Sequence, residues 1–298
     1  MIRIEYSSMC LNELNYRDKI NQAQAFVQAQ GFDFGIQIHN SIDKSLYDKL
    51  IEFKGAIPFS VHSPVFSRYF LNLASTDFSI IQECSDTCIR YLNDLNTDLF
   101  FFHGFFMTEK PIVHDMKNYR RTIREGIGDS YCLNGSFIME PTFFNTDTFQ
   151  KYKTIFQKNF TNFKQRYSDF TIALENDFPG IGSGLQRPAE INELIDNLWF
   201  DLGHFWTASL LHEFDFHDEA FKLLETKNVV GVHLNHNLVT HSDPKEKIRD
   251  SHTHFYLPST MNLKPIVRKI FEKNISPVVL EIVDGDLRDI ETLLDWIE

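Results

Sequence analysis

Two short stretches of the sequence decide the fold. Residues 171–176 read Thr-Ile-Ala-Leu-Glu-Asn, and residues 229–235 read Val-Val-Gly-Val-His-Leu-Asn. Each is an apolar run that ends in a side chain able to bind a metal ion, Glu175 in the first and His233 in the second. Strands that are buried on both faces of a parallel sheet have this composition, and functional side chains gather at the carboxyl ends of such strands. The same pattern identifies the other strands.

Similar runs recur along the chain and alternate with helical patterns, which is typical of βαβ units. The predicted strands are Ile2–Ser7, Phe34–His39, Pro58–His62, Asp98–His103, Thr171–Glu175, Leu198–Asp201, Val229–Leu234 and Pro277–Ile282. The predicted helices are Arg17–Gln30, Phe78–Asn93, Asp147–Tyr167, Glu190–Asn197, Glu219–Lys227, Leu263–Lys273 and Leu287–Ile297. Eight strands, with a final helix that ends the chain, predict a closed α/β barrel. We therefore expect residues 1–298 to form a single (β/α)₈ TIM barrel.

One connection is longer than a single helix requires. It runs from Gly104 to Thr171 and contains the stretch Asp129–Asn145, which has no clear periodicity. Long loops without a pattern are often functional. We predict an insertion after strand 4, at about residues 105–169 together with helix 4, that covers the mouth of the barrel. Together with a predicted loop at Phe205–His217, it is expected to set the choice of substrate.

Most predicted strands from the third onward end in His, Asp or Glu, and further such residues follow strands 6 and 7. These candidate metal ligands are His62, His103, Glu175, Asp201, His204, His233, Asp250, His252 and Glu281. In a barrel the strand ends meet at one mouth. Buried carboxylates would repel one another there unless cations neutralised them, and imidazole with carboxylate suits Zn²⁺, Mn²⁺ and Fe²⁺. The pattern predicts one to three divalent ions per chain, with zinc first and manganese or iron as alternatives.

Composition restricts the partners. The formal charge is −12, which does not support a nucleic-acid partner held by a broad basic surface, although bound cations would reverse the field at the mouth. The first residues, Met1–Ser8, read as a strand, so no signal peptide is expected, and no apolar run of membrane-spanning length is present. We expect a cytoplasmic protein with no membrane partner, acting on a small sugar or a phosphoester.

The ligand pattern resembles the xylose isomerase-like TIM barrel superfamily, and within it the endonuclease IV family (AP endonuclease family 2). Local sequences that carry the resemblance are Leu71-Asn72-Leu73 after His62, Glu175-Asn176 and His233-Leu234-Asn235. Endonuclease IV holds three zinc ions with nine ligands, and the resemblance implies those roles for the nine candidates above. It further implies that Glu175 bridges two ions and that metal-activated water hydrolyses a phosphoester beside Glu281.

The chain departs from that family in several places. The Asp-Arg-His of the family is Asp250-Ser251-His252 here, the basic residue expected soon after His233-x-Asn is replaced by His236-Asn237-Leu238, and the DNA-gripping loops have no clear equivalent. A pairing of His252 with His254 is an alternative register for the last ligand pair. These departures bear on DNA binding more than on metal binding.

Sugar isomerases and epimerases of the same superfamily offer a second interpretation. The resemblance to them implies one Mn-type ion at Glu175, Asp201, His233 and Glu281, with the two glutamates moving a proton at carbon. His62, His103 and His204 would then be free to hydrogen-bond a sugar. A third interpretation is a barrel that has lost catalysis and serves as a binding module.

The sequence thus predicts a metal-dependent enzyme, with hydrolysis first and isomerisation as the alternative. The predicted catalytic residues are Glu175, Glu281 and His204. The predicted substrate-binding residues are Asn176, Trp206 and His254.

Overall fold

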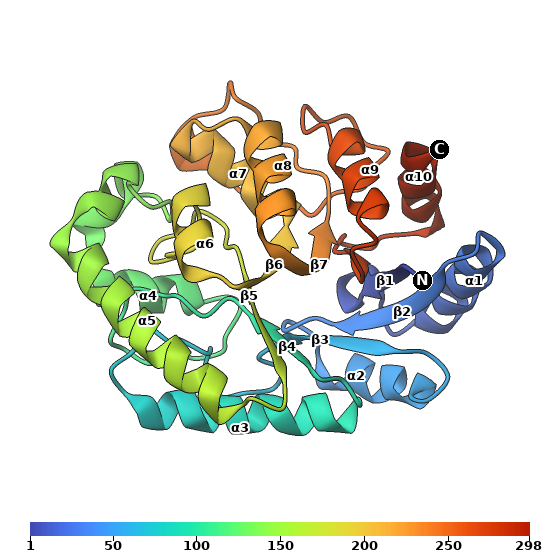
Figure 1. Cartoon of the computed structure of the whole chain (residues 1–298), viewed down its shortest axis with the longest axis horizontal. Helices are drawn as coiled ribbons and strands as arrows, with labels where there is room; N and C mark the ends of the chain where they lie inside the picture. The colour runs from blue at the N-terminus through green and yellow to red at the C-terminus, as the bar shows by residue number, and fades with distance from the viewer.

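The chain folds into a closed barrel of eight parallel strands, as the sequence predicts (Figure 1). The computed structural model describes all 298 residues. Each strand pairs with the next, and β1 pairs with β8 to close the barrel. The strands are β1 Arg3–Ser7, β2 Asp33–Ile38, β3 Phe59–Ser63, β4 Leu99–Phe102, β5 Thr171–Glu175, β6 Asn197–Asp201, β7 Asn228–Leu234 and β8 Val278–Leu280.

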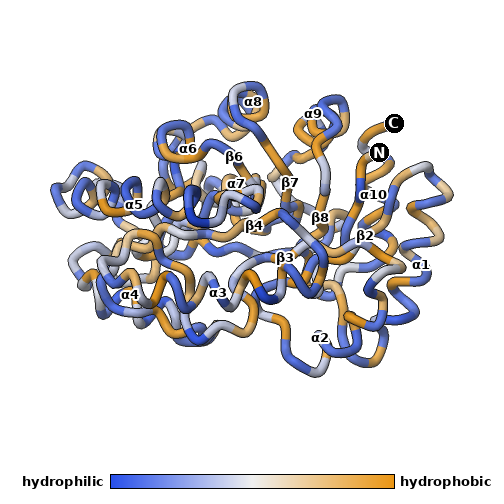
Figure 2. The backbone as a smooth tube through the Cα atoms, turned by 60° about the horizontal axis from the view of Figure 1, so that its bottom comes forward, coloured by the Kyte–Doolittle hydropathy of each residue, from blue (hydrophilic) through white to orange (hydrophobic).

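Helices surround the barrel and bury their apolar faces against it. They are α1 Tyr16–Ala29, α2 Lys44–Leu50, α3 Phe78–Asp94, α4 Tyr119–Ile127, α5 Asp147–Arg166, α6 Pro188–Leu194, α7 Leu202–His212, α8 Phe216–Thr226, α9 Lys264–Glu272 and α10 Leu287–Ile297. Hydrophilic and hydrophobic residues alternate along most of these helices (Figure 2), as expected for helices with one solvated face. Helices α1 and α10 pack together, so the two ends of the chain lie on the same side. No helix combines the length and the apolar character that crossing a membrane demands.

Strand register brings the predicted ligands to one end of the barrel. Asp201 of β6 lies opposite His233 of β7, and His233 in turn lies opposite Val279 of β8, two residues before Glu281. All strands run in the same direction, so their carboxyl ends form one mouth. The predicted convergence therefore follows directly from the pairing.

Beneath the mouth, the barrel is filled by an apolar layer. The rings of Phe101 and Trp199 stack with centroids 3.7 Å apart and planes at 4°. Gly231 of β7 leaves room for this layer, because a Cβ there would lie 2.3 Å from the Trp199 ring. His62 stacks on the upper side of the same layer, 5.2 Å from the Phe101 ring, so aromatic packing supports the candidate ligands from below.

Two of the sequence expectations about local structure need correction. The segment Phe205–His217 is not a loop, because α7 and α8 occupy most of it. Helix α7 begins directly after β6, where the Asp201 side chain accepts a hydrogen bond from the backbone N–H of His204. Residues 202–211 of this helix are all buried, so the helix lacks the polar face that reveals a helix in sequence. The helices that were predicted by range also did not include α2 or α4.

The long connection from β4 to β5 contains α4, three short 3₁₀ turns and the outer helix α5. The turns are Asp129–Tyr131, Leu133–Gly135 and Pro141–Asn145. Its first part packs around a small separate cluster that includes Phe106, Ile112 and Ile123. Because Phe106 and residues at the start of α4 also border the cavity at the mouth, this part lies on the side of the barrel where the insertion was predicted.

Candidate metal centre

All nine predicted metal ligands lie at the mouth of the barrel, in overlapping groups. Within each group the potential ligand atoms lie within 4.8 Å of one another. Three of the groups are Glu175, Asp201, His233 and Glu281; His62, His103 and Glu175; and His204, Asp250 and His252. A further group, His103, Asp177 and His204, links the last two. Glu175 belongs to two of them. Residues that are far apart in sequence thus form one continuous cluster.

Glu175 lies at the centre of the cluster and is fully buried. Its Oε1 is 2.6 Å from Nδ1 of His233, and its Oε2 is 3.0 Å from Nε2 of His62 and 3.6 Å from Nε2 of His103. The last residue of β5 therefore faces imidazoles from three other strand ends. A carboxylate in this position could help to hold more than one cation.

Three histidines have one ring nitrogen fixed by an oxygen that can only accept a hydrogen bond. Nδ1–H of His204 donates to the carbonyl of Asn176 over 3.1 Å, and Nδ1–H of His252 donates to the carbonyl of Glu281 over 2.9 Å. Nε2–H of His233 donates to Oε1 of Gln37 over 2.8 Å. Metal-ligating histidines are usually held in this way, because the fixed N–H leaves the other nitrogen free to bind the ion.

The free nitrogen of each of these histidines faces carboxylate oxygens. Nε2 of His204 and of His252 lie 3.1 Å and 2.9 Å from Oδ2 of Asp250. Nδ1 of His233 lies 3.3 Å from Oε2 of Glu281 in addition to its contact with Glu175. A neutral imidazole would direct a lone pair at these oxygens, so either a proton or a metal cation must lie between them.

The neighbouring carboxylates and burial shift the pKa values of the histidines at the mouth in opposite directions. Burial alone would lower the pKa of His252, but the Asp250 carboxylate outweighs it and raises the pKa to about 10. Burial would likewise lower the pKa of His233, yet the carboxylates of Glu281 and Glu175 hold it well above its usual range. Burial lowers the pKa of His62 to about 4, so His62 is neutral near neutral pH. Divalent ions would displace the protons that the first two carry.

Unsatisfied buried atoms support the same conclusion. Apart from these imidazole contacts, Oε2 of Glu175, Oδ2 of Asp201, Oδ2 of Asp250 and Oε2 of Glu281 are buried without a hydrogen-bond donor, and no other group of the chain hydrogen-bonds the ring nitrogens of His62. Such atoms are rare in folded proteins, because each loses its hydration without compensation. Imidazole nitrogen and carboxylate oxygen, with no cysteine among them, suit Zn²⁺, Mn²⁺ or Fe²⁺. The residues present therefore fit a divalent metal centre.

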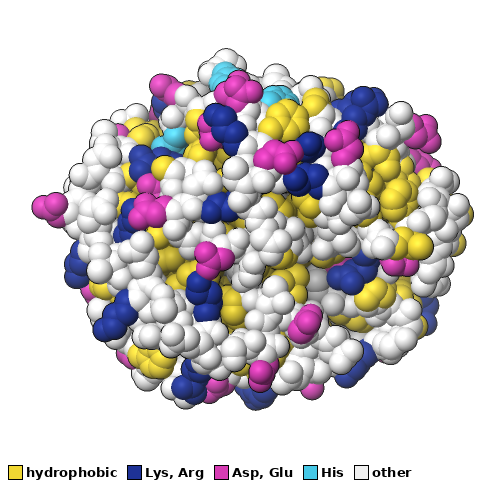
Figure 3. Space-filling view, viewed as in Figure 1, with side chains coloured by type: hydrophobic (Ala, Val, Ile, Leu, Met, Phe, Trp, Pro, Cys, Tyr) yellow, Lys and Arg dark blue, Asp and Glu magenta, His cyan; other side chains and the backbone are white.

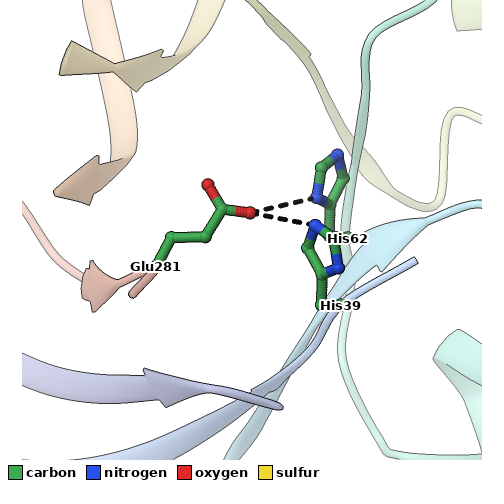
Figure 4. Close-up of side chains that lie close together, drawn as sticks. All are labelled: His39, His62 and Glu281. Carbon is green, nitrogen blue, oxygen red and sulfur yellow. Dashed lines mark ion pairs between the residues drawn. The ribbon is translucent and has the colours of Figure 1, made fainter. Parts of the chain in front are cut away.

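Two further residues at the mouth were not among the predicted ligands. His39 follows β2, and its Nε2 lies 3.0 Å from Oε1 of Glu281, while Nδ1 of His62 lies 3.9 Å from the same oxygen (Figure 4). Oδ1 of Asp177 lies 3.8 Å from Nδ1 of His103. His39 ends a predicted strand, which is the signal that could have revealed it. Asp177 lies two residues beyond Glu175, in a loop.

The three predicted substrate-binding residues do not line the cavity at the mouth. The Asn176 amide joins β5 to β6, since Nδ2 donates to the Asp201 carbonyl and Oδ1 accepts from its N–H. The Trp206 Nε1–H donates to the Val239 carbonyl, and Nδ1 of His254 lies 2.8 Å from the carboxylate of Asp289. The positions of these three residues give their predicted roles no support. Of the two candidate partners for His252, the structure places Asp250 beside it, whereas His254 pairs with Asp289.

A chain of buried polar groups runs down the barrel from His233. Nε2–H of Gln37 donates to Oγ of Ser60 over 3.3 Å, and Ser60 donates to Oε2 of Glu5. Nε of Arg3 lies 2.6 Å from the other oxygen of Glu5. Because the Gln37 amide nitrogen is committed to Ser60, its oxygen is directed at His233. Gln37 thus determines which nitrogen of His233 is free to bind metal.

Replacing Gln37 with leucine should weaken metal binding at His233. Loss of an outer hydrogen-bond partner typically reduces metal affinity by about 10- to 100-fold. Zinc affinity, measured by competition with a chromophoric chelator, tests this. The matched control is Gln28→Leu, which lies on the exposed face of α1. Equal affinities of Gln37→Leu and the unchanged protein would contradict a positioning role for Gln37.

Comparison with known proteins shows the fold and not the family. No protein-family model matches the chain, and no curated protein matches it in sequence. A solved structure described as a D-tagatose 3-epimerase-like protein is 18% identical with a TM-score of 0.59, covering 100% of this chain and 98% of the other. The 3-keto-D-glucoside 4-epimerase YcjR from E. coli is 11% identical with a TM-score of 0.55, covering 100% and 99%. The IOLI protein, solved with a bound zinc atom, is 13% identical with a TM-score of 0.52, covering 100% and 98%. The chain thus has the barrel fold of these structures, and none of the three is an endonuclease IV, the family that the sequence was expected to resemble most.

Proposed function

We propose that this protein is a divalent-metal-dependent enzyme that isomerises or epimerises a small sugar or sugar derivative. The observation that carries the proposal is the buried group of Glu175, Asp201, His233 and Glu281 beneath a cavity of about 270 Å³. Solved structures with the same barrel include two named as sugar epimerases or epimerase-like. This reaction is the alternative, not the first, of the activities that the sequence suggests.

The substrate we propose is small. The cavity is bordered by the candidate ligands on one side and by Met116, Tyr119 and Arg120 of the insertion on the other. Its volume is slightly below the usual range for ligand pockets, about 300–1,000 Å³, so it suits a monosaccharide rather than a duplex. On the face shown in Figure 3, basic and acidic side chains are interspersed without an extended basic patch. Size and charge together argue against a nucleic-acid substrate.

The residues of the chain would divide the chemistry between them. A divalent ion held by Glu175, Asp201, His233 and Glu281 would bind sugar oxygens and acidify the neighbouring C–H. Glu281 lines the cavity and would take a proton from carbon. Glu175 approaches from β5, three strands away around the barrel, and would serve as its partner. His204 also lines the cavity, with Nε2 on the side of Asp250, and would hydrogen-bond a sugar hydroxyl.

Hydrolysis of a phosphoester is the second candidate, and one observation favours it. Glu175 is not part of the cavity lining, and its Oε2 faces His62 and His103 instead. Together with the group of His204, Asp250 and His252, these histidines offer places for additional ions. Several ions beside one another suit attack on phosphorus, since they stabilise both the entering and the leaving oxygen.

Metal stoichiometry of His103→Ala separates the two candidates. If His62, His103 and Glu175 hold an ion of their own, the variant should lose about one ion per chain, because losing a ligand weakens that ion specifically. If only the four-residue group binds metal, the count should start at one and stay there. Plasma emission spectrometry of the purified proteins measures it, with the exposed His241→Ala as control. Three ions falling to two would contradict the single-ion isomerase.

Activity assays complete the test. Isomerisation or epimerisation in D₂O places deuterium on carbon, which proton NMR detects for a panel of ketoses and their phosphates. Hydrolysis releases inorganic phosphate from the same phosphates or cleaves DNA that contains an abasic site. Phosphate release without deuterium incorporation would overturn the proposed isomerase in favour of the second candidate.

A further inference from the structure

We propose that Arg120 binds an anionic group of the substrate, so that the substrate is an acidic sugar derivative, a sugar phosphate or a sugar acid. The inference deepens the proposed function and rests on its assignment of a small sugar-derived substrate to this cavity. It concerns the part of the cavity lining that the insertion contributes.

Arg120 is the only lysine or arginine that lines the cavity. The other charged or ionisable lining residues are His39, His62, His103, Asp177, His204, Asp250, His252, Glu281 and Tyr119. Three carboxylates, those of Asp177, Asp250 and Glu281, line the same cavity. Arg120 forms no ion pair with any, and Asp177 has only His103 within ion-pair distance. The guanidinium of Arg120 therefore has no carboxylate partner within the chain.

The neighbouring arginines of α4 behave differently. Nε of Arg121 lies 3.0 Å from the carboxylate of Glu125, and Nε of Arg124 lies 2.6 Å from that of Asp129. Both of these pairs lie outside the cavity. The one arginine of the helix that reaches the cavity is thus the one without a carboxylate partner, which is the arrangement expected of a ligand-binding group.

Aromatic contacts hold Arg120 in place and leave its terminal nitrogens free. Its guanidinium lies over the Phe178 ring, 4.9 Å from the centroid, and its Nε donates to the Tyr119 hydroxyl over 2.9 Å. Phe178 is itself buried and lines the cavity. Stacking occupies the face of the guanidinium but not its edge. Neither terminal nitrogen donates a hydrogen bond within the chain, so a two-pronged contact with an anion remains open.

The chemistry of the contact defines the class of ligand. The planar fork of a guanidinium matches the paired oxygens of a phosphate or a carboxylate, and such bonds are stronger than those between neutral groups. A neutral sugar would leave this charge unpaired in a half-buried place. Arg120 would therefore select the anionic end of the substrate, while the metal centre would bind the hydroxyl or carbonyl end.

The proposal is tested by calorimetric binding of three related probes to the metal-loaded protein, namely ribose 5-phosphate, ribonate and ribose. The unchanged protein should bind at least one of the two anions more tightly than ribose. Arg120→Gln should weaken the binding of that anion by about 10- to 100-fold, as expected for loss of hydrogen bonds to a charged group, and should leave the affinity for ribose unchanged. Arg120→Lys keeps the charge and loses the planar fork, so its affinity for the anion should lie between those of the unchanged protein and Arg120→Gln. Arg121→Gln, beside it but outside the cavity, should bind like the unchanged protein.

The probes separate the two sources of negative charge. Dependence on Arg120 for ribose 5-phosphate alone assigns a phosphate ester, and dependence for ribonate alone assigns a sugar acid. The proposal is overturned if Arg120→Gln and the unchanged protein have equal affinities for each of the two anions. It is also overturned if the variant loses as much affinity for ribose as for the anions, or if the unchanged protein binds neither anion more tightly than ribose. Binding is measured without turnover, so an inactive protein that binds ribose 5-phosphate through Arg120 would refute the proposed reaction and uphold this inference.

Discussion

Removing divalent ions with a chelator is expected to lower the melting temperature by roughly 10 °C, from loss of about 4 kcal/mol of binding free energy at a thousandfold excess over Kd. The expectation follows from the carboxylates of Glu175, Asp201 and Glu281, which surround His233 in the fully buried part of the site. Without cations these groups repel one another or must recruit protons. Differential scanning calorimetry before chelation, after chelation and after reloading measures the shift.

A variant that cannot bind the central ion provides the control for that experiment. In Asp201→Asn the chelator should produce a much smaller shift, because one ligand of the buried group has lost its charge. Asp196→Asn should respond like the unchanged protein, since Asp196 is exposed and pairs with Lys164 on the outside of the barrel. An unchanged protein whose melting temperature is the same with and without ions would contradict a preformed metal centre.

Glu175→Gln should cause the largest loss of activity of any single change at the mouth. Glutamine keeps the shape of the side chain and removes the charge that faces His233, His62 and His103. A positioned acid or base alone contributes about 10²–10⁴-fold to the rate, and loss of a metal ligand adds to that. We therefore expect kcat to fall by about a thousandfold or more, in whichever assay the unchanged protein is active.

The same variant should lose bound metal, since Glu175 belongs to two of the ligand groups. The matched control is Glu193→Gln, an exposed glutamate of α6 that pairs with Lys153 over 2.5 Å. A Glu175→Gln protein that retains all its ions and works within tenfold of the original rate would rule out a central role for this residue in either of the two proposed reactions.

The fold and the nine candidate ligands could be predicted because both depend on local sequence. Short apolar runs ending in Glu175, Asp201 or His233 indicate the strands and the mouth simultaneously. Helix α7 was not predicted because it is buried on all sides and starts immediately after Asp201, so neither a polar face nor a separating loop marks it in the sequence. A helix of this kind cannot be distinguished from an apolar loop by periodicity.

Parts of the candidate site could not be predicted because they depend on how separate segments meet. The role of Gln37 requires that β2 and β7 turn those two side chains toward each other across the barrel. The place of Arg120 requires the path of an insertion without clear periodicity. The choice between Asp250 and His254 depends on the backbone of His252, whose φ of 44° lies in the left-handed region. None of these is visible in spacing alone.

The position of the ligands along the chain has a consequence for how the protein is made. The central group draws its members from β5, β6, β7 and the residue directly after β8, the strand that closes the barrel. The free nitrogen of His233 is in addition selected by Gln37, close to the other end of the chain. No nascent fragment that stops before Glu281 contains the complete group. An ion held by this group could therefore be bound in full only after all eight strands have been synthesised.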